Sequence, residues 1–190
     1  MAKIYAIRTS DGHTQIVNSW PECQKITSGV PNVAYKSFPS EEQAQAWFKK
    51  FLPIGYPPGI AEVYTDGSYM DGRTGWAFVV VENGGCIHDA YGEIPTCDDS
   101  HNIAGEIEAA TRALKWAAKA KKEIVIRHDY IGLVRFVEGT WEARSEIAQQ
   151  FLQAYHSLPV KAYFHHVAGH SGNEWNDRAD MLAKRTISAI

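Results

Sequence analysis

The chain has 190 residues, of which 45% are hydrophobic and 22% charged, and this composition is typical of soluble globular proteins. No apolar run approaches the roughly 20 residues that a helix needs to cross a bilayer, and no apolar block of signal-peptide length stands near the N-terminus, which excludes a membrane-spanning class. The net charge of −3 is unevenly spread, because residues 1–50 carry six Lys or Arg against four Asp or Glu, while residues 51–190 carry 13 against 18.

The first fifty residues have the pattern of a small α/β domain. Short strands are expected at residues 3–8, 14–17 and 34–38. Helices are expected after Ser19 and after Ser40, because a Ser-x-x-Glu or Ser-x-x-Gln capping box begins at each serine. Proline and glycine then become frequent, and that composition cannot continue a helix. We therefore predict a first domain at residues 1–51 and a linker at residues 52–60.

The rest of the chain, residues 61–190, has the pattern of a larger α/β domain. Three strands in an antiparallel meander are expected first, at residues 62–65, 75–82 and 87–91. Helices are then expected at residues 103–122, 130–137, 144–158 and 176–188, and further strands at residues 123–128 and 160–167. This order predicts a mixed five-stranded sheet flanked by helices, preceded by a small domain with a three-stranded antiparallel sheet.

The cysteines bear on the compartment. There are three, widely spaced, and the odd number excludes a fully paired disulfide framework. We expect reduced thiols, and therefore a cytoplasmic protein. Separately, we expect a monomer that has no membrane partner.

Two aspartates, Asp66 and Asp129, each come directly after a predicted strand. Asp66 precedes a glycine, so a simple Asp-Gly turn is the alternative there. On adjacent central strands the two carboxylates would meet at the edge of the sheet where ligands collect. Like charges so close together destabilise a fold unless a cation lies between them. The pattern therefore indicates a metal site.

The predicted helices supply further acids. Glu106 and Glu108 are two residues apart and face different sides of one helix, so only one can point into a given site. Gly105 allows close backbone approach and favours Glu106, which leaves Glu108 on the solvated surface. Asp180 lies on the last predicted helix. Oxygen ligands without thiolates favour Mg²⁺ or Mn²⁺ over zinc, and several carboxylates without a protein nucleophile suit two-metal phosphodiester hydrolysis.

Four segments resemble, in order and spacing, the motifs of type 1 ribonuclease H. They read Y-T-D-G-S at residues 64–68, A-G-E-I-E-A at 104–109, I-R-H-D-Y at 126–130, and V-A-G-H-S-G followed by N-D-R-A-D within 167–180. The resemblance covers residues 61–187 and implies a ribonuclease H-like fold. It also implies cleavage of the RNA strand of RNA–DNA hybrids to 5′-phosphate and 3′-hydroxyl ends. By position, two Mg²⁺ ions, or Mn²⁺ as a substitute, would be held by Asp66, Glu106, Asp129 and Asp180.

The same resemblance assigns roles around the acids. His170 lies on a glycine-flanked loop and fits a proton shuttle or an aid to product release. Asn102 resembles an asparagine of the family that contacts nucleic acid near the scissile bond. Gly67 and Ser68 would offer backbone N–H groups to the RNA 2′-hydroxyl or to phosphate, and the 2′-hydroxyl is what distinguishes RNA from DNA.

The first domain has a resemblance of its own. Residues 4–8, 19–23 and 35–38 look like the small hybrid-binding, viroplasmin-like domain that precedes many cellular ribonucleases H. This implies that Tyr5 and Trp20 pack on the DNA strand and that Lys36 contacts phosphate, whereas core packing is the alternative for the two aromatic residues. The family often has a second lysine where this chain has Ser37. The expected partner is an RNA–DNA hybrid, with double-stranded RNA as a second candidate.

Two other functions stay open on the sequence. One is a non-catalytic module that binds hybrids or double-stranded RNA on an inactive nuclease fold. The other is a different nuclease of the ribonuclease H-like superfamily, such as an integrase, a transposase or a Holliday-junction nuclease. The four acids argue against the first, and the T-D-G-S, G-H-S-G and N-D-R-A-D sequences argue against the second.

Overall fold

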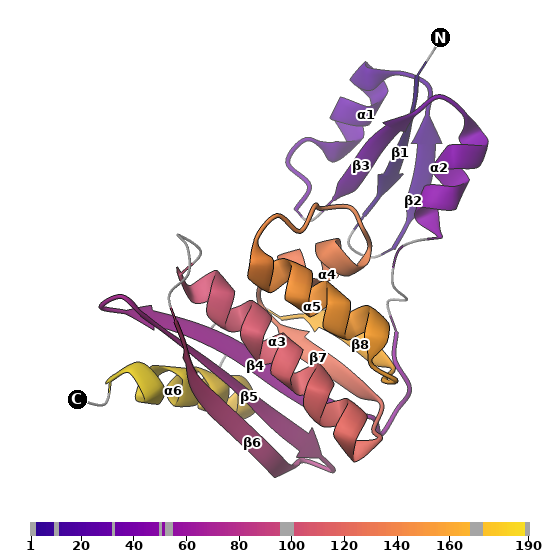
Figure 1. The fold of residues 1–190 in the computed structure, drawn as a ribbon. Helices are drawn as coiled ribbons and strands as arrows, with labels where there is room; N and C mark the ends of the chain where they lie inside the picture. Colours follow the sequence, from indigo (N-terminus) through magenta and orange to yellow (C-terminus); the bar gives the residue numbers. More distant parts are fainter. Residues whose placement is uncertain are drawn as a thin grey trace. The chain divides into compact units, whose positions relative to one another are not determined.

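A computed structural model of the chain describes residues 3–9, 12–31, 33–49, 51, 55–95, 101–167 and 173–188. The chain forms two compact units (Figure 1). The first contains residues 1–54 together with residues 138–140, and the second contains residues 55–137 and 141–190. Among the described residues, no helix is both long and apolar enough to cross a membrane.

The first unit is a three-stranded antiparallel sheet with two helices. In chain order it consists of β1 (Ile4–Arg8), β2 (Thr14–Val17), α1 (Trp20–Thr27), β3 (Ala34–Phe38) and α2 (Glu41–Phe48), and β1 is the central strand. Both predicted capping boxes begin a helix. The Ser19 hydroxyl accepts from the N–H of Glu22 at 3.4 Å and donates to the Glu22 carboxylate at 3.0 Å. The Ser40 hydroxyl accepts from the N–H of Gln43 at 3.4 Å.

The two helices of this unit cover opposite faces of its sheet. Ala6 of β1 packs with Ala44 and Trp47 of α2, whereas the next residue, Ile7, packs with Cys23 of α1. Successive side chains of a strand point to opposite faces, so α2 lies on one face and α1 on the other. Tyr5 therefore shares the face of α1.

The second unit is a mixed five-stranded sheet in the order β6-β5-β4-β7-β8. Its strands are β4 (Ala61–Met70), β5 (Arg73–Glu82), β6 (Gly85–Ile94), β7 (Ile124–His128) and β8 (Ala162–His166). Its helices are α3 (His101–Ala120), α4 (Gly132–Val137), α5 (Glu146–Ser157) and α6 (Glu174–Ser188). The first three strands form the antiparallel meander, whereas β7 is parallel to both β4 and β8. The predicted fold class is therefore confirmed.

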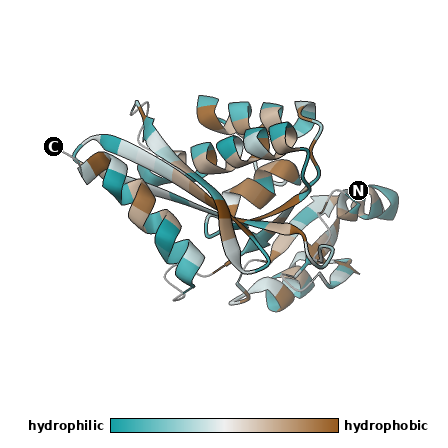
Figure 2. Ribbon diagram, turned by 90° about the horizontal axis from the view of Figure 1, so that it is seen from below, coloured by the Kyte–Doolittle hydropathy of each residue, from teal (hydrophilic) through white to brown (hydrophobic). Residues whose placement is uncertain are grey.

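Helices cover both faces of this sheet. The larger core joins Val63, Phe78 and Ile126 to α3 and α5, and includes Leu114 and Phe151. A smaller core on the opposite face joins Tyr64 of β4 and alternate residues of β5 to Ala179, Leu182 and Ala183 of α6. Figure 2 shows α6 on one side of the strands of this unit and the other helices of the same unit on the opposite side, with hydrophilic and hydrophobic residues alternating along α6.

Strand β4 is longer than the sequence predicted. We expected a strand at residues 62–65 that ends at Asp66, but β4 continues to Met70. The reason is its antiparallel partner, because β5 pairs with β4 as far as Met70 and Arg73. The parallel pairing with β7, by contrast, ends at Tyr64 and Arg127. Asp66 therefore stands within a strand, just beyond the point where β4 loses its β7 neighbour.

Candidate active site

The four predicted metal ligands line one cavity of about 620 Å³ in the second unit. Asp66 comes from β4, Glu106 from α3, Asp129 from the residue after β7, and Asp180 from α6. The remaining lining residues are Gly67, Ser68, Tyr69, His101, Asn102, Ile103, Tyr130, Asn176 and Lys184. Four elements that are distant in sequence thus bring four carboxyl groups to one place, as the sequence predicted.

Glycines hold the surrounding backbone close together. A methyl group on Gly67 would collide with the backbone of Asn102 and Glu106, and one on Gly105 would collide with the carbonyl oxygen of Gly75. On the other face, a methyl group on Gly75 would collide with the carbonyl oxygen of Ala183 in α6. Helices α3 and α6 therefore lie directly on the backbone of the sheet, and this contact sets the positions of the acids that they carry.

Asp66 and Glu106 share one hydrogen-bond donor. The backbone N–H of Gly67 lies 2.7 Å from Asp66 Oδ1 and 2.9 Å from Glu106 Oε1. Glu106 is only 5% exposed, and its Oε2 atom is fully buried with no hydrogen-bond partner among the described residues. A buried carboxylate oxygen without a donor is costly, so the arrangement calls for a further positive group.

The electrostatics of the site point the same way. Burial is the main cause that raises the pKa of Asp66 to about 6, and the charges of Asp129 and Asp180 raise it further. Burial likewise raises the pKa of Glu106 well above its ordinary value, and the charges of Asp66 and Asp129 add to the shift. The protein around Asp66 and Glu106 therefore does not fully compensate the burial of these carboxyl groups and the charges of their acidic neighbours.

The donors fit a hard divalent cation. The four acids offer only oxygen atoms, which Mg²⁺ and Mn²⁺ prefer, and the bare Glu106 Oε2 atom supplies an unused lone pair. Within the described part of the chain, however, no three His, Cys, Asp or Glu side chains are already arranged as a coordination group. Asp180 is paired with Lys184, whose ammonium lies 2.7 Å from Oδ1 and 2.8 Å from Oδ2.

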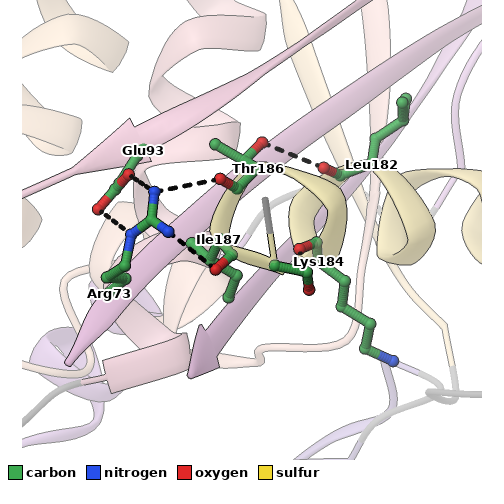
Figure 3. Close-up of polar contacts among 7 residues, drawn as sticks. Arg73, Glu93, Leu182, Lys184, Thr186 and Ile187 are labelled. Carbon is green, nitrogen blue, oxygen red and sulfur yellow. Dashed lines mark hydrogen bonds and ion pairs between the residues drawn. The ribbon is translucent and has the colours of Figure 1, made fainter. Parts of the chain in front are cut away.

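Helix α6, which carries Asp180, is anchored at its end by Arg73 (Figure 3). The guanidinium of Arg73 donates to both carboxylate oxygens of Glu93, at 3.0 and 2.6 Å. It also donates to the carbonyl oxygens of Ile187 at 3.0 Å and of Thr186 at 3.3 Å. A cation at the end of a helix satisfies carbonyls that have no partner within the helix, so Arg73 joins the last turn of α6 to β5 and β6.

The prediction for Glu108 is wrong. We expected a solvated surface residue, but Glu108 is only 8% exposed and accepts from Arg112 at 2.6 Å. Arg112 in turn lies over the ring of Trp76 at 5.2 Å, so the pair is packed against an aromatic side chain of β5. Glu108 does not line the cavity, in agreement with its exclusion from the ligand set.

The polar residues expected to contact nucleic acid also line the cavity, namely Gly67, Ser68 and Asn102. The sequence reasoning missed Tyr69 and His101, whose rings lie 4.1 Å apart and line the same cavity. Each is the immediate neighbour of a predicted contact residue, and that adjacency was the available signal.

His170 lies outside the described residues. Two described histidines, His128 and His166, contact the turn that carries Asp129. His128 is fully buried, and its Nδ1 atom lies 3.0 Å from the carbonyl oxygen of Tyr130, to which it donates. Burial is the main cause that lowers the pKa of His128 to about 3, so the ring is neutral. His166 Nε2 lies 2.9 Å from the carbonyl oxygen of Asp129, so both histidines support the turn that carries this acid.

The first unit presents an aromatic cluster that consists of Tyr5, Trp20 and Tyr35. The ring centroids of Tyr5 and Trp20 are 5.7 Å apart, and those of Trp20 and Tyr35 are 5.8 Å apart. Trp20 is 42% exposed and Tyr35 48% exposed, so Trp20 is not a core residue. Tyr35 was missed, because an exposed aromatic residue of a strand has no sequence signature that distinguishes it from a buried one. Lys36 is exposed but follows Tyr35 on β3, so it lies on the opposite face of the sheet.

Comparison with solved structures shows which class of fold this is. The second unit is similar to ribonuclease H1 from the halophilic archaeon Halobacterium salinarum, with a TM-score of 0.56 and 23% identity over 68% of this chain and 98% of that chain. It is also similar to LC11-RNase H1 in complex with an RNA/DNA hybrid, with a TM-score of 0.54 and 24% identity over 67% of this chain and 96% of that chain. The mixed sheet and its helices thus have the ribonuclease H fold.

Sequence comparison shows the family. Residues 59–188 match the family model described as RNase H, and residues 3–48 match the one described as Ribonuclease H1 N-terminal domain. A protein named Ribonuclease H from Halorhodospira halophila is 30% identical over 152 residues, which cover 70% of this chain and 95% of that protein. Another of the same name, from a Cyanothece species, is 29% identical over 140 residues, which cover 66% and 87%. The chain therefore belongs to the ribonuclease H family of enzymes and carries the N-terminal domain of ribonuclease H1.

Proposed function

We propose that this chain is an endonuclease that hydrolyses the RNA strand of RNA–DNA hybrids by a two-metal-ion mechanism and leaves 5′-phosphate and 3′-hydroxyl ends. One observation carries the proposal: Asp66, Glu106, Asp129 and Asp180 converge on one cavity within the segment that matches the RNase H family. The structural similarity to LC11-RNase H1, which was solved with an RNA/DNA hybrid, supports the substrate class.

The four acids would hold the metal ions. Two Mg²⁺ ions, or Mn²⁺ in their place, would activate the attacking water and stabilise the charge on the leaving 3′-oxygen. The raised pKa values of Asp66 and Glu106 mean that both carboxyl groups bind protons more tightly than usual, and a cation would compete with those protons. The packing of Gly67 and Gly105 keeps these two acids in place, so little reorganisation accompanies loading of the site.

Ser68 and Asn102 are proposed as the polar contacts to the RNA strand. Both line the cavity beside the acids. The N–H of Gly67, which the sequence also suggested for this role, already donates to Asp66 and Glu106. We therefore assign Gly67 to the placement of the acids rather than to the substrate.

The first unit would hold the hybrid through its aromatic cluster. Exposed aromatic rings would pack on the sugar-phosphate of the DNA strand regardless of base sequence, which suits a domain that keeps an enzyme on its substrate. Lys36, on the other face of β3, would contact phosphate only where the nucleic acid passes around this edge strand. Double-stranded RNA is a second candidate partner for this unit.

One assay tests the proposal. End-labelled RNA–DNA hybrid, double-stranded RNA, double-stranded DNA and single-stranded RNA are each incubated with the protein in Mg²⁺ and in EDTA. We expect internal cuts in the RNA strand of the hybrid alone, in Mg²⁺ alone, and 5′-phosphates on the downstream products. Cleavage in EDTA, or of double-stranded DNA, would contradict the proposal. Binding of the hybrid without cleavage in any divalent ion would identify a binding module instead.

A further inference from the structure

The cavity contains a cation of its own. Among the described residues that line it, Lys184 is the only lysine or arginine. Its ammonium contacts both carboxylate oxygens of Asp180, at 2.7 and 2.8 Å. The side chains are partly exposed, 49% for Lys184 and 25% for Asp180, so water reaches the pair. Both residues belong to α6 and stand four positions apart, which places them on one face of the helix.

Because of this ion pair, the negative charges of the four acids are compensated unequally. Within the described part of the chain, Asp180 is the member of the quartet that has an ion-pair partner, whereas Glu106 keeps a buried oxygen with no donor at all. A divalent cation that enters the cavity could therefore bind Asp66 and Glu106 directly, whereas at Asp180 it would have to compete with Lys184.

The helix cannot easily relieve this competition by moving. Its last turn is held to β5 and β6 by Arg73, and its middle lies against the backbone of Gly75 at Ala183. Figure 3 shows the Lys184 side chain directed away from Arg73, so the anchor and the ion pair are separate contacts of one helix. Asp180 consequently stays in place, and the flexible lysine side chain is the part that can leave.

We propose that Lys184 is a built-in counter-ion for Asp180, which a divalent ion must displace, and that it thereby sets the metal concentration at which the Asp180 side of the site fills. This inference rests on the proposed function, because it takes Asp180 as a metal ligand. Lys184 stabilises the metal-free protein and weakens metal binding by the same contact.

Calorimetric titration of the substrate-free full-length protein with Mn²⁺ tests the inference. Replacement of Lys184 by methionine should lower the Mn²⁺ dissociation constant about two- to five-fold, the size expected for loss of a partly exposed ion pair. Lys184→Arg keeps the charge and should stay close to the wild type. Arg185→Met is the matched control, because it removes the same charge from the next, exposed position of α6 and should leave the dissociation constant nearly unchanged.

A second background isolates the contact. When Asp180 is replaced by asparagine, Lys184→Met should no longer tighten Mn²⁺ binding, because the competition is gone. Thermal unfolding in EDTA gives a readout that does not depend on metal or activity: Lys184→Met should melt at a lower temperature than Arg185→Met does.

Three results would overturn the inference. Equal effects of Lys184→Met and Arg185→Met would show only a general effect of charge. An unchanged dissociation constant in Lys184→Met, beside normal binding by the wild type, would remove the counter-ion role and leave the proposed function intact. Failure of the wild type to bind any divalent ion would remove both.

Discussion

The backbone N–H of Gly67 in β4 donates to the Glu106 carboxylate in α3 at 2.9 Å, across 39 positions of sequence. The same N–H also donates to Asp66, so one peptide group orients two acids that come from different elements. A strand and a helix must approach within backbone contact for this to occur, and the absence of side chains at Gly67 and Gly105 permits that approach.

Gly67→Ala should therefore remove activity almost completely. The added methyl group would collide with backbone atoms of Asn102 and Glu106, which cannot rotate away. We expect a loss of at least about a hundred-fold in kcat, as for a displacement of about 1 Å in an active site, and a loss of about 1–3 kcal/mol in the free energy of unfolding. Gly55→Ala is the control, because nothing lies within 4 Å of its added methyl group. Normal kinetics in Gly67→Ala would refute the role of this contact.

Asp129→Asn should separate binding from cleavage. The substitution keeps the size of the side chain and removes one of the four charges of the cavity. We expect the affinity for hybrid to persist while kcat falls at least about a thousand-fold, which corresponds to several kcal/mol of transition-state stabilisation. Single-turnover cleavage and a filter-binding assay measure the two quantities. Activity near the wild-type level would exclude Asp129 from the quartet.

The stability of the metal-free protein should depend on pH in an unusual direction. The folded-state pKa of Asp66 is raised to about 6 from an ordinary value of 3.8, so the folded protein holds this proton more tightly than the unfolded chain does. The stabilisation is complete below pH 3.8 and is lost as the pH rises through about 6. For Asp66 alone the loss is at most about 3 kcal/mol.

Chemical denaturation in EDTA between pH 4 and pH 7 measures this effect. The wild type should lose stability over that range relative to Asp66→Asn, which has no carboxyl group to deprotonate. Saturating Mg²⁺ should abolish most of the difference, because a bound cation stabilises the ionised form of the buried carboxyl group. Parallel pH profiles for the two proteins in EDTA would show that folding does not raise the pKa of Asp66.

Loss of the aromatic cluster should weaken binding without changing the chemical step. Trp20→Ala and Tyr35→Ala each remove a ring that is nearly half exposed. Each should raise KM for the hybrid roughly five-fold, which corresponds to about 1 kcal/mol per ring, and leave kcat unchanged. Tyr91→Ala removes a similarly exposed ring from β6 of the second unit and is the control. A fall in kcat with constant KM would contradict a role in substrate binding.

The elements of the first unit could be predicted because their signals are local. Two serines with Glu22 and Gln43 three residues later begin both helices, and the three strands lie within the ranges that their composition predicted. The convergence of the four acids on one cavity could also be predicted, because the ribonuclease H motifs fix their order along the chain. None of these conclusions required knowledge of which elements touch.

The errors concern contacts that no local pattern encodes. β4 extends past Asp66 because β5 pairs with it, and the pairing is known only from the fold. Glu108 is paired with Arg112, which itself lies over the ring of Trp76 in another element. Tyr35 joins Trp20 through the register of β3 beside β1, which the sequence does not state. In all three cases the structure depends on a contact with another element, which the residue's own sequence neighbourhood does not reveal.

Strand β4 has neighbours on both edges as far as Tyr64 and only β5 beyond it. As far as Tyr64, each backbone amide of β4 points toward β5 or β7, and its hydrogen can exchange with solvent only when the pairing with that strand opens. Beyond Tyr64, the edge of β4 that faces away from β5 has no strand partner. Asp66 and Asp129 thus lie just beyond the point where β4 and β7 stop pairing. A phosphodiester could therefore reach both acids without any loss of strand pairing.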